Sequence, residues 1–166
     1  MSYITLFLFG FFSITSFNVN AKVVASTKIK RDGLTVLEYN DKENKITIEI
    51  KTHQYRSSNK EKDNPLVCTG SVEPCILTDS LKIRKGSKYL NVPVSTFLDL
   101  SDISTIGLIK RKKIIFLEIT GGDASESYIS NIYFDDKGVL KRTLSSSIVP
   151  NEPSELTIYF YGAIGE

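Results

Sequence analysis

The sequence predicts a mainly β protein, either an antiparallel β-sandwich or a strongly curved antiparallel sheet, with at most one or two short helices. The first observation is a series of short runs, rich in Ile, Leu, Tyr, Phe and Thr, separated by Gly, Asp, Asn or Pro. The second is strict alternation of apolar and polar residues in 45–52 and 156–161. A sheet built from such strands needs a second layer to cover its apolar face.

The last fifty residues predict an antiparallel meander, because four such runs follow one another with short turns between them. In the final run, Leu156, Ile158 and Phe160 share one face, while Thr157, Tyr159 and Tyr161 share the other, wetter face. The four predicted strands are Ile114–Thr120, Tyr128–Phe134, Val139–Ser145 and Leu156–Tyr161.

The preceding part of the chain predicts the strands of the second layer. The clearest alternation is in Lys45–Thr52, where Ile46, Ile48 and Ile50 point one way and charged or hydroxyl side chains point the other. The other predicted strands are Val23–Lys30, Leu34–Tyr39, Leu81–Lys85 and Tyr89–Val94.

The segment Pro93–Ile109 combines a helical spacing of apolar residues with residues that disfavour helix interiors. Its apolar residues Phe97, Leu100, Ile103 and Ile106 recur every three positions, as in a short helix or a 3₁₀ turn. Ser, Thr and Asp fill the gaps, and these residues favour caps and turns over helix interiors. We therefore predict one short helical segment near 95–100.

Residues 1–21 have the pattern of a secretory signal peptide. An apolar run over 4–14 is too short to span a bilayer, and Val19-Asn20-Ala21 offers small or modest residues before a cleavage site. No Lys or Arg precedes the apolar run, which is unusual for such a segment; the alternative is a buried N-terminal strand or helix. We expect a periplasmic or secreted protein with a single β-rich domain over residues 22–166, and no integral membrane segment after cleavage.

The two cysteines, Cys68 and Cys75, predict a disulfide bond. They flank a turn that contains Gly and Pro, and export would expose them to an oxidising compartment. A metal site would need more ligands than two thiols and His53, the only histidine, are expected to supply. We expect no bound metal.

The sequence favours a protein without catalytic residues. Any Ser–His or Cys–His system would depend on His53, which lies at the end of a predicted strand. There is no Gly-x-Ser-x-Gly motif and no phosphate-binding Gly-rich loop. The carboxylate pair Asp135 and Asp136 is better explained by a hairpin turn. We expect neither an enzyme nor a cofactor.

Charge is divided unevenly along the chain. The formal net charge of +2 argues against nucleic acid as a partner. Residues 22–113 hold 18 basic and 11 acidic side chains, whereas residues 114–166 hold 3 basic and 8 acidic ones. The division indicates either two halves with complementary surfaces or an acidic end that attracts a basic partner. That acidic end would be formed by Glu118, Asp123, Glu126, Glu152 and Glu155.

The basic run Lys110–Lys113 permits a second interpretation, adhesion to anionic lipid headgroups or polymers. More often, however, such a run at a turn between strands is a solvated hairpin tip or a strand edge protected from aggregation by charge.

The loop Gly121–Tyr128 is the predicted contact surface. It combines a flexible backbone, small hydrogen-bonding side chains, two carboxylates and an aromatic anchor, a composition suited to polar recognition. The candidate partner-binding residues are Asp123, Ser125, Glu126 and Tyr128.

Size, export, β-rich pattern and missing catalytic groups together favour an exported binding protein. We expect a protein partner, and the specific hypothesis is an immunity-type inhibitor of a periplasmic or envelope-acting toxin or hydrolase. The alternative is a module that binds a small ligand, a glycan or an envelope surface, without an inhibitory role.

Overall fold

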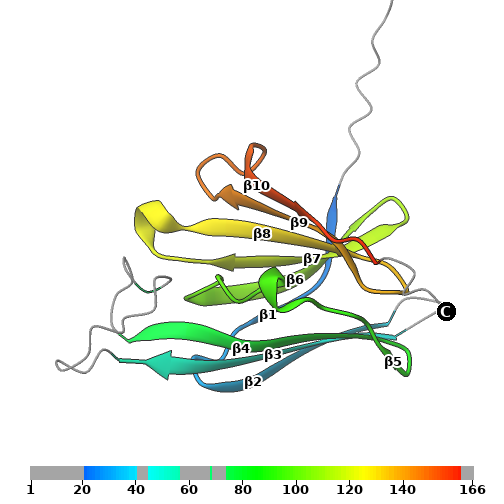
Figure 1. The fold of residues 1–166 in the computed structure, drawn as a ribbon, viewed down its shortest axis with the longest axis horizontal. Helices are drawn as coiled ribbons and strands as arrows, with labels where there is room; N and C mark the ends of the chain where they lie inside the picture. Colours follow the sequence, from blue (N-terminus) through cyan, green and yellow to red (C-terminus); the bar gives the residue numbers. More distant parts are fainter. Residues whose placement is uncertain (1–20, 41–44, 57–67, 69–73, 162–166) are drawn as a thin grey trace, which may run out of the picture.

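The chain forms two antiparallel β-sheets (Figure 1). The computed structural model describes residues 21–40, 45–56, 68 and 74–161; the predicted signal peptide lies outside them except for Ala21. The strands are β1 (Lys22–Lys28), β2 (Gly33–Asn40), β3 (Lys45–Tyr55), β4 (Cys75–Lys85), β5 (Lys88–Tyr89), β6 (Ile103–Arg111), β7 (Ile114–Gly121), β8 (Tyr128–Phe134), β9 (Val139–Ser146) and β10 (Pro153–Ile158). The helical elements are the 3₁₀ turns η2 (Val94–Thr96) and η3 (Ala124–Glu126). The predicted mainly β, sandwich-like fold is confirmed.

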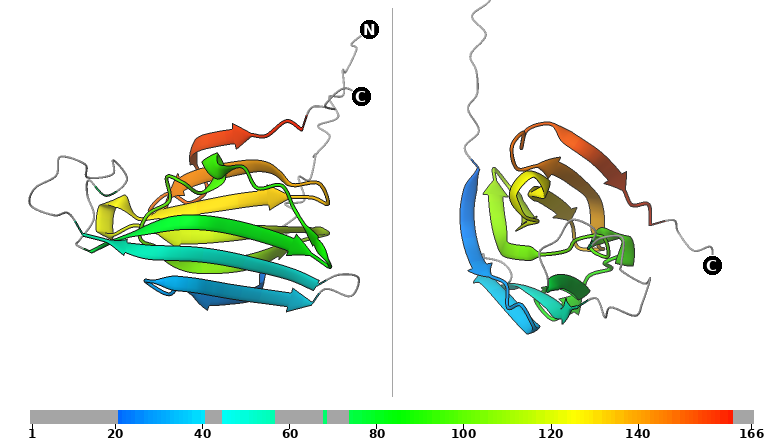
Figure 2. Two further views of the ribbon diagram at one scale, coloured as in Figure 1. Left: turned by 60° about the horizontal axis from the view of Figure 1, so that its bottom comes forward. Right: turned by 90° about the vertical axis from the view of Figure 1, so that its left-hand side faces the viewer.

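The two sheets share one hydrophobic core. The six-stranded sheet has the order β1-β6-β7-β8-β9-β10, and the four-stranded sheet has the order β2-β3-β4-β5. Seen from the end, the larger sheet curls over the smaller one (Figure 2). Ile48 of β3 and Ile83 of β4 pack in the same cluster as Leu117 of β7 and Ile132 of β8. The alternation predicted for β3 is confirmed, since its isoleucines all face this core.

The predicted C-terminal meander is also confirmed, and β6 extends it by one strand. From β6 to β10, each strand pairs with the next in an antiparallel register. The sequence patterns did not predict a strand at Ile103–Arg111, and this was wrong, because β6 lies there. The three-residue spacing crosses an element boundary, because Phe97 and Leu100 precede the strand whereas Ile103 and Ile106 belong to it.

Residues 90–102, which we call the crossing segment, run over the gap between the two sheets (Figure 1). Asn91 forms a parallel bridge with Gly138 at the turn between β8 and β9, and Ser101 forms an antiparallel bridge with Leu77 in β4. Phe97 is buried in the shared core. The predicted helical segment near 95–100 is only the single turn η2, at residues 94–96, followed by a non-helical stretch.

The last strand differs from its prediction in extent and in orientation. It spans 153–158 rather than 156–161. Leu156, Ile158 and Phe160, the predicted apolar face, are 58%, 54% and 88% exposed. Tyr159, expected on the wetter face, packs against the core. β10 is the last strand of the larger sheet and pairs with β9 alone, and each of its residues except Thr157 is exposed.

Two strands of the smaller sheet also differ from their predicted bounds. β4 begins at residue 75 instead of 81, and β5 has two residues where the sequence predicted 89–94 as a strand. The Leu90 amide still donates to the Ile83 carbonyl of β4 over 2.8 Å, and the chain then continues into the crossing segment.

Candidate functional site

The predicted contact residues lie around η3, the turn that joins β7 to β8 at one end of the sandwich (Figure 1). Asp123, Ser125 and Glu126 are exposed there. Tyr128, the first residue of β8, is half-buried and packs against the core instead. The structure therefore keeps three of the four candidates on one exposed turn and places the fourth beneath it.

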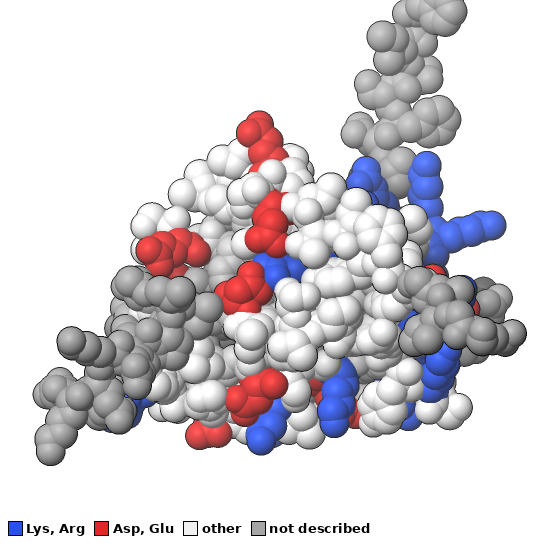
Figure 3. All heavy atoms as spheres, viewed as in Figure 1, with Lys and Arg blue, Asp and Glu red and all other residues white. Residues whose placement is uncertain are grey.

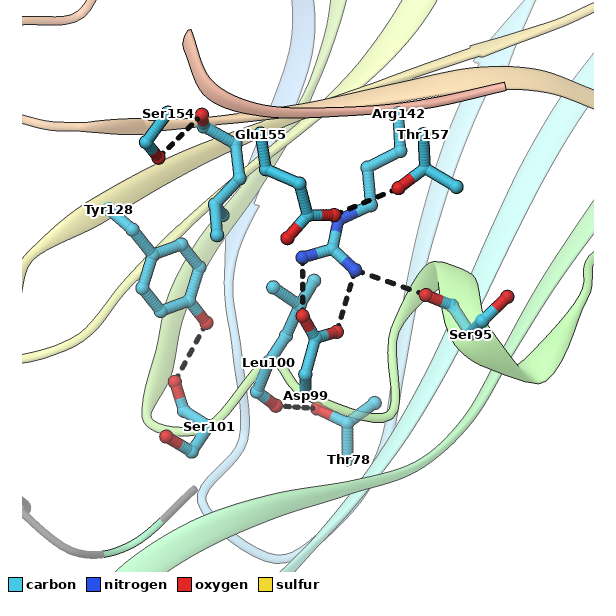
Figure 4. A network of polar contacts seen from close by, with 11 residues as sticks. Thr78, Ser95, Asp99, Leu100, Ser101, Tyr128, Arg142, Ser154, Glu155 and Thr157 are labelled. Atoms are coloured by element: carbon cyan, nitrogen blue, oxygen red, sulfur yellow. Dashed lines mark hydrogen bonds and ion pairs between the residues drawn. The ribbon is translucent and has the colours of Figure 1, made fainter. Parts of the chain in front are cut away.

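Tyr128 supports the turn from below. Its hydroxyl donates a hydrogen bond of 2.7 Å to the carbonyl oxygen of Ser101 in the crossing segment (Figure 4). Burial, reinforced by the negative charges of Asp102 and Asp99, raises the pKa of Tyr128 above its ordinary value. The neutral Tyr128 side chain thus links β8 to the crossing segment through this hydrogen bond.

The backbone around η3 is held in an uncommon conformation. Gly122, Ala124 and Asp102 have φ angles of 75°, 42° and 48°. For a residue with a side chain, this left-handed region costs about 1 kcal/mol or more. The Gly122 amide donates a hydrogen bond of 3.2 Å to the Asp102 carbonyl, which joins two of these positions. Strain of this kind persists only where the surroundings fix the chain, and it is common at functional sites.

Asp102 connects the turn to the disulfide-bonded part of the protein. Its amide donates to the carbonyl of Ile76 over 2.7 Å, and its carboxylate accepts the Ile76 amide over 2.8 Å. The neighbouring Cys75 is bonded to Cys68, with 5.8 Å between their Cα atoms, which confirms the predicted disulfide. The η3 turn therefore rests on a cross-linked support.

The turn between β9 and β10 is joined directly to η3. The Ser147 amide donates to the Ser127 carbonyl over 2.9 Å, and the hydroxyl groups of these two serines also form a hydrogen bond. The Ser127 hydroxyl donates its proton to the carbonyl of Ala124 over 2.8 Å, so it accepts from the Ser147 hydroxyl. Two loops that are distant in the sequence thereby form one surface.

This second turn adds apolar side chains to the acidic ones. Ile148 is 72% exposed, and Val149 beside it is exposed as well. Acidic atoms lie over η3 and over the β9–β10 turn in Figure 3. We call this surface the acidic face; its exposed residues are Asp123, Ser125, Glu126, Ile148, Val149 and Glu152.

The sequence predicted only part of the acidic face. Glu118 lies in the middle of β7, paired with Gly107 and Asn131, and its burial raises its pKa. Glu155 accepts a hydrogen bond from the Thr157 hydroxyl over 2.8 Å. Neither belongs to η3 or to the β9–β10 turn. The apolar pair 148–149 was not predicted from the sequence, although two β-branched apolar residues directly before Pro-Asn, in a turn, are a signal for it.

A buried arginine fixes the crossing segment that supports η3. Arg142 of β9 is 1% exposed, and its guanidinium donates two hydrogen bonds of 2.6 Å to the carboxylate of Asp99 (Figure 4). A further hydrogen bond of 3.1 Å reaches the Ser95 carbonyl. Burial acts to lower the pKa of Arg142, but the hydrogen bonds and charge of Asp99, with the charge of Glu155, outweigh it and raise that pKa. The bidentate pair pins the segment to β9.

The only histidine lies in β3, in the other sheet. The His53 Nδ1 atom is 2.5 Å from the Asp79 carboxylate, which also lies 3.8 Å from the Lys51 ammonium. This group is an exposed cluster of charged and titratable side chains. That the protein is not an enzyme stays a prediction.

Comparison with known protein families, with curated proteins and with solved structures finds no match for this chain. Within the described ranges, no group of three or more His, Cys, Asp or Glu side chains is arranged to hold a metal ion. The helical turns in those ranges are too short to span a membrane. Any functional assignment must therefore come from the surfaces themselves.

Proposed function

We propose that this protein is an exported binding protein, an immunity-type inhibitor of a periplasmic or envelope-acting toxin or hydrolase. The observation that carries the proposal is the acidic face. Its two turns are joined to each other and to a disulfide-bonded strand, and they present carboxylates around exposed apolar side chains. A surface with this composition suits a partner whose contact region is basic around an apolar pocket.

The rigidity of the acidic face favours tight association. Binding costs free energy whenever loops and side chains must be ordered, and hydrogen bonds already hold both turns in place. Asp123, Glu126 and Glu152 would accelerate the encounter with a cationic partner. Ile148, the more exposed of the two apolar side chains in the second turn, would be the anchor that enters the partner.

Export is part of the proposal. Strand β1 begins at Lys22, so cleavage after Ala21 would leave every described strand intact. The disulfide between Cys68 and Cys75 is the type of bond that persists in oxidising compartments. Intact-mass measurement of material from the periplasm or the medium tests this part; retention of residues 1–21 or two free thiols would contradict it.

The contact surface is tested after affinity capture of the partner from the native periplasm. In the double variant Asp123→Lys with Glu126→Lys, association should be about tenfold slower at low ionic strength and depend less on salt. Neutralisation by Asp123→Asn with Glu126→Gln should give an intermediate rate. Ile148→Ala should instead speed dissociation by about tenfold.

The matched control is Asp32→Lys, which reverses an exposed carboxylate on the turn between β1 and β2. It should leave the kinetics unchanged, and the thermal midpoint should be close to that of the wild type in every variant. If the double charge reversal leaves partner binding untouched, the contact surface lies elsewhere and the assignment is wrong.

A further inference from the structure

The end of the sandwich opposite η3 contains a pocket that the proposed function does not use. It lies where the hairpin of β6 and β7, the hairpin of β8 and β9, and the end of β10 approach the smaller sheet, and its volume is about 750 Å³. Pockets of several hundred Å³ with mostly apolar walls are typical of small-molecule sites.

The pocket exists because two hairpins of the same sheet diverge. The pairing of β6 with β7 continues to Arg111 and Ile114, whereas the pairing of β7 with β8 stops at Phe116 and Tyr133. Ile114 and Ile115 therefore have no partner in β8. Figure 1 shows the consequence: the β6–β7 hairpin turns upward and the β8–β9 hairpin turns downward at the right-hand end.

The walls of the pocket are apolar. Ile114, Leu140 and Ile158 come from three different strands, and all three line it. They are 58%, 41% and 54% exposed. Phe134 of β8 and Ile46 of β3 line it as well. Apolar side chains that converge in this way mark a binding site more often than scattered ones do.

The charged groups of the pocket are mainly basic. Lys85 is paired with Asp136, and the Asp135 carboxylate accepts hydrogen bonds from the backbone of its own turn. Lys113 is exposed on the β6–β7 turn, and the Lys141 ammonium lies 4.5 Å above the centre of the Tyr133 ring. Basic atoms also gather at this end in Figure 3.

We propose that this pocket binds an amphiphile that has a single anionic head group and an apolar body. The apolar body would contact Ile114, Leu140 and Ile158, and the head group would lie at the rim between Lys113 and Lys141. Removing apolar surface from water supplies affinity, and the two ammonium groups select the sign of the head group's charge. This site is independent of the acidic face.

Binding is measured by isothermal titration calorimetry with three probes of equal chain length, each below its micelle concentration. Dodecanoate and dodecyl phosphate carry the two anionic head groups, and dodecyltrimethylammonium carries a cationic one. At least one anionic probe should bind about tenfold or more tightly than the cation. The better anionic probe identifies whether a carboxylate or a phosphate is the natural head group.

Two variants locate the site. Lys113→Gln with Lys141→Gln should weaken binding of the anionic probes by about tenfold or more and should not weaken binding of the cation. The control Arg111→Gln with Lys137→Gln removes two exposed charges from the same two hairpins, outside the pocket, and should have little effect. Leu140→Trp should fill the pocket and abolish binding of all three probes.

A second tryptophan variant, Val36→Trp, adds the same ring at an exposed position of β2 outside the pocket and should bind as the wild type does. Circular dichroism verifies that each variant is folded. The proposal is overturned if no anionic probe binds at concentrations up to about 1 mM. It is equally overturned if the cation binds as tightly as the anions, or if Leu140→Trp retains wild-type affinity for dodecanoate.

Discussion

The two ends of the sandwich are built on opposite principles. At the η3 end, Tyr128 fills the space beneath the turn, and hydrogen bonds join η3 to the crossing segment and to the β9–β10 turn. At the other end, the two hairpins separate and leave a pocket of about 750 Å³. The first end carries exposed carboxylates, and lysines lie around the second.

The difference shows how one sheet can offer two kinds of surface. A turn held by hydrogen bonds on several sides needs little ordering when it binds, and it therefore suits a preformed contact with a macromolecule. Two hairpins that diverge leave apolar side chains without packing partners, and the space between them suits a ligand small enough to enter. Three changes test whether the η3 end is truly the more firmly supported of the two.

The largest expected effect is that of Tyr128→Ala. Removing the ring and its hydroxyl should lower the free energy of unfolding by about 3 kcal/mol. The comparison variant is Tyr133→Ala at the pocket end, which loses the partial burial of its ring and the stacking on Phe116 at 4.8 Å, and should cost about 2 kcal/mol. Urea denaturation measures both, and equal losses would contradict the contrast between the ends.

A smaller loss is expected for Gly122→Ala. A Cβ atom there would lie 2.3 Å from the Glu126 carbonyl oxygen, and the residue would keep a φ of +75°. The strain should lower the free energy of unfolding by about 2 kcal/mol. Gly33→Ala is the control, because Gly33 also has a positive φ but its Cβ position is open.

Gly33→Ala should therefore cost about 1 kcal/mol, the conformational part alone. The difference between the two glycine variants, obtained from the same denaturation experiments, measures how tightly η3 is enclosed. A difference near zero would show that the turn yields freely.

The smallest effect is that of Tyr128→Phe, which removes one hydrogen bond and should cost about 1 kcal/mol at neutral pH. Because burial raises the pKa of Tyr128 in the folded state, the unfolded chain loses the phenol proton first, near pH 10. The wild type should therefore lose stability as the pH rises above 10. The phenylalanine variant should lose less over that range, and thermal midpoints between pH 8 and 11 test this; parallel curves would exclude such a role for Tyr128.

Strands β3 and β10 show how far sequence patterns determined the fold. Both alternate apolar and polar residues, and both form strands. In β3 the apolar set faces the core, as predicted, and packs against the strands of the larger sheet. In β10 the apolar set is exposed, because the register with β9 places Thr157, and not Leu156 or Ile158, opposite the buried Arg142. Alternation shows which residues share a face but not which face is buried.

In the candidate site, too, some features could be predicted from the local sequence and others could not. Local composition was sufficient to place Asp123, Ser125 and Glu126 on an exposed turn, and the spacing of Cys68 and Cys75 was sufficient to predict their bond. It was not sufficient to place Tyr128, whose partner in the crossing segment lies 27 residues earlier in the chain.

The sequence by itself determined the β-rich class, the meander and the disulfide, because turn residues, two-residue alternation and close cysteines act over short distances along the chain. Only the tertiary structure decided the rest. The bidentate pair of Arg142 with Asp99 joins residues 43 positions apart. The acidic face forms only where η3 contacts the β9–β10 turn, and the pocket forms only where the β6–β7 and β8–β9 hairpins diverge. These features depend on strand register and sheet curvature, which are set by the packing of the whole core and not by any single segment.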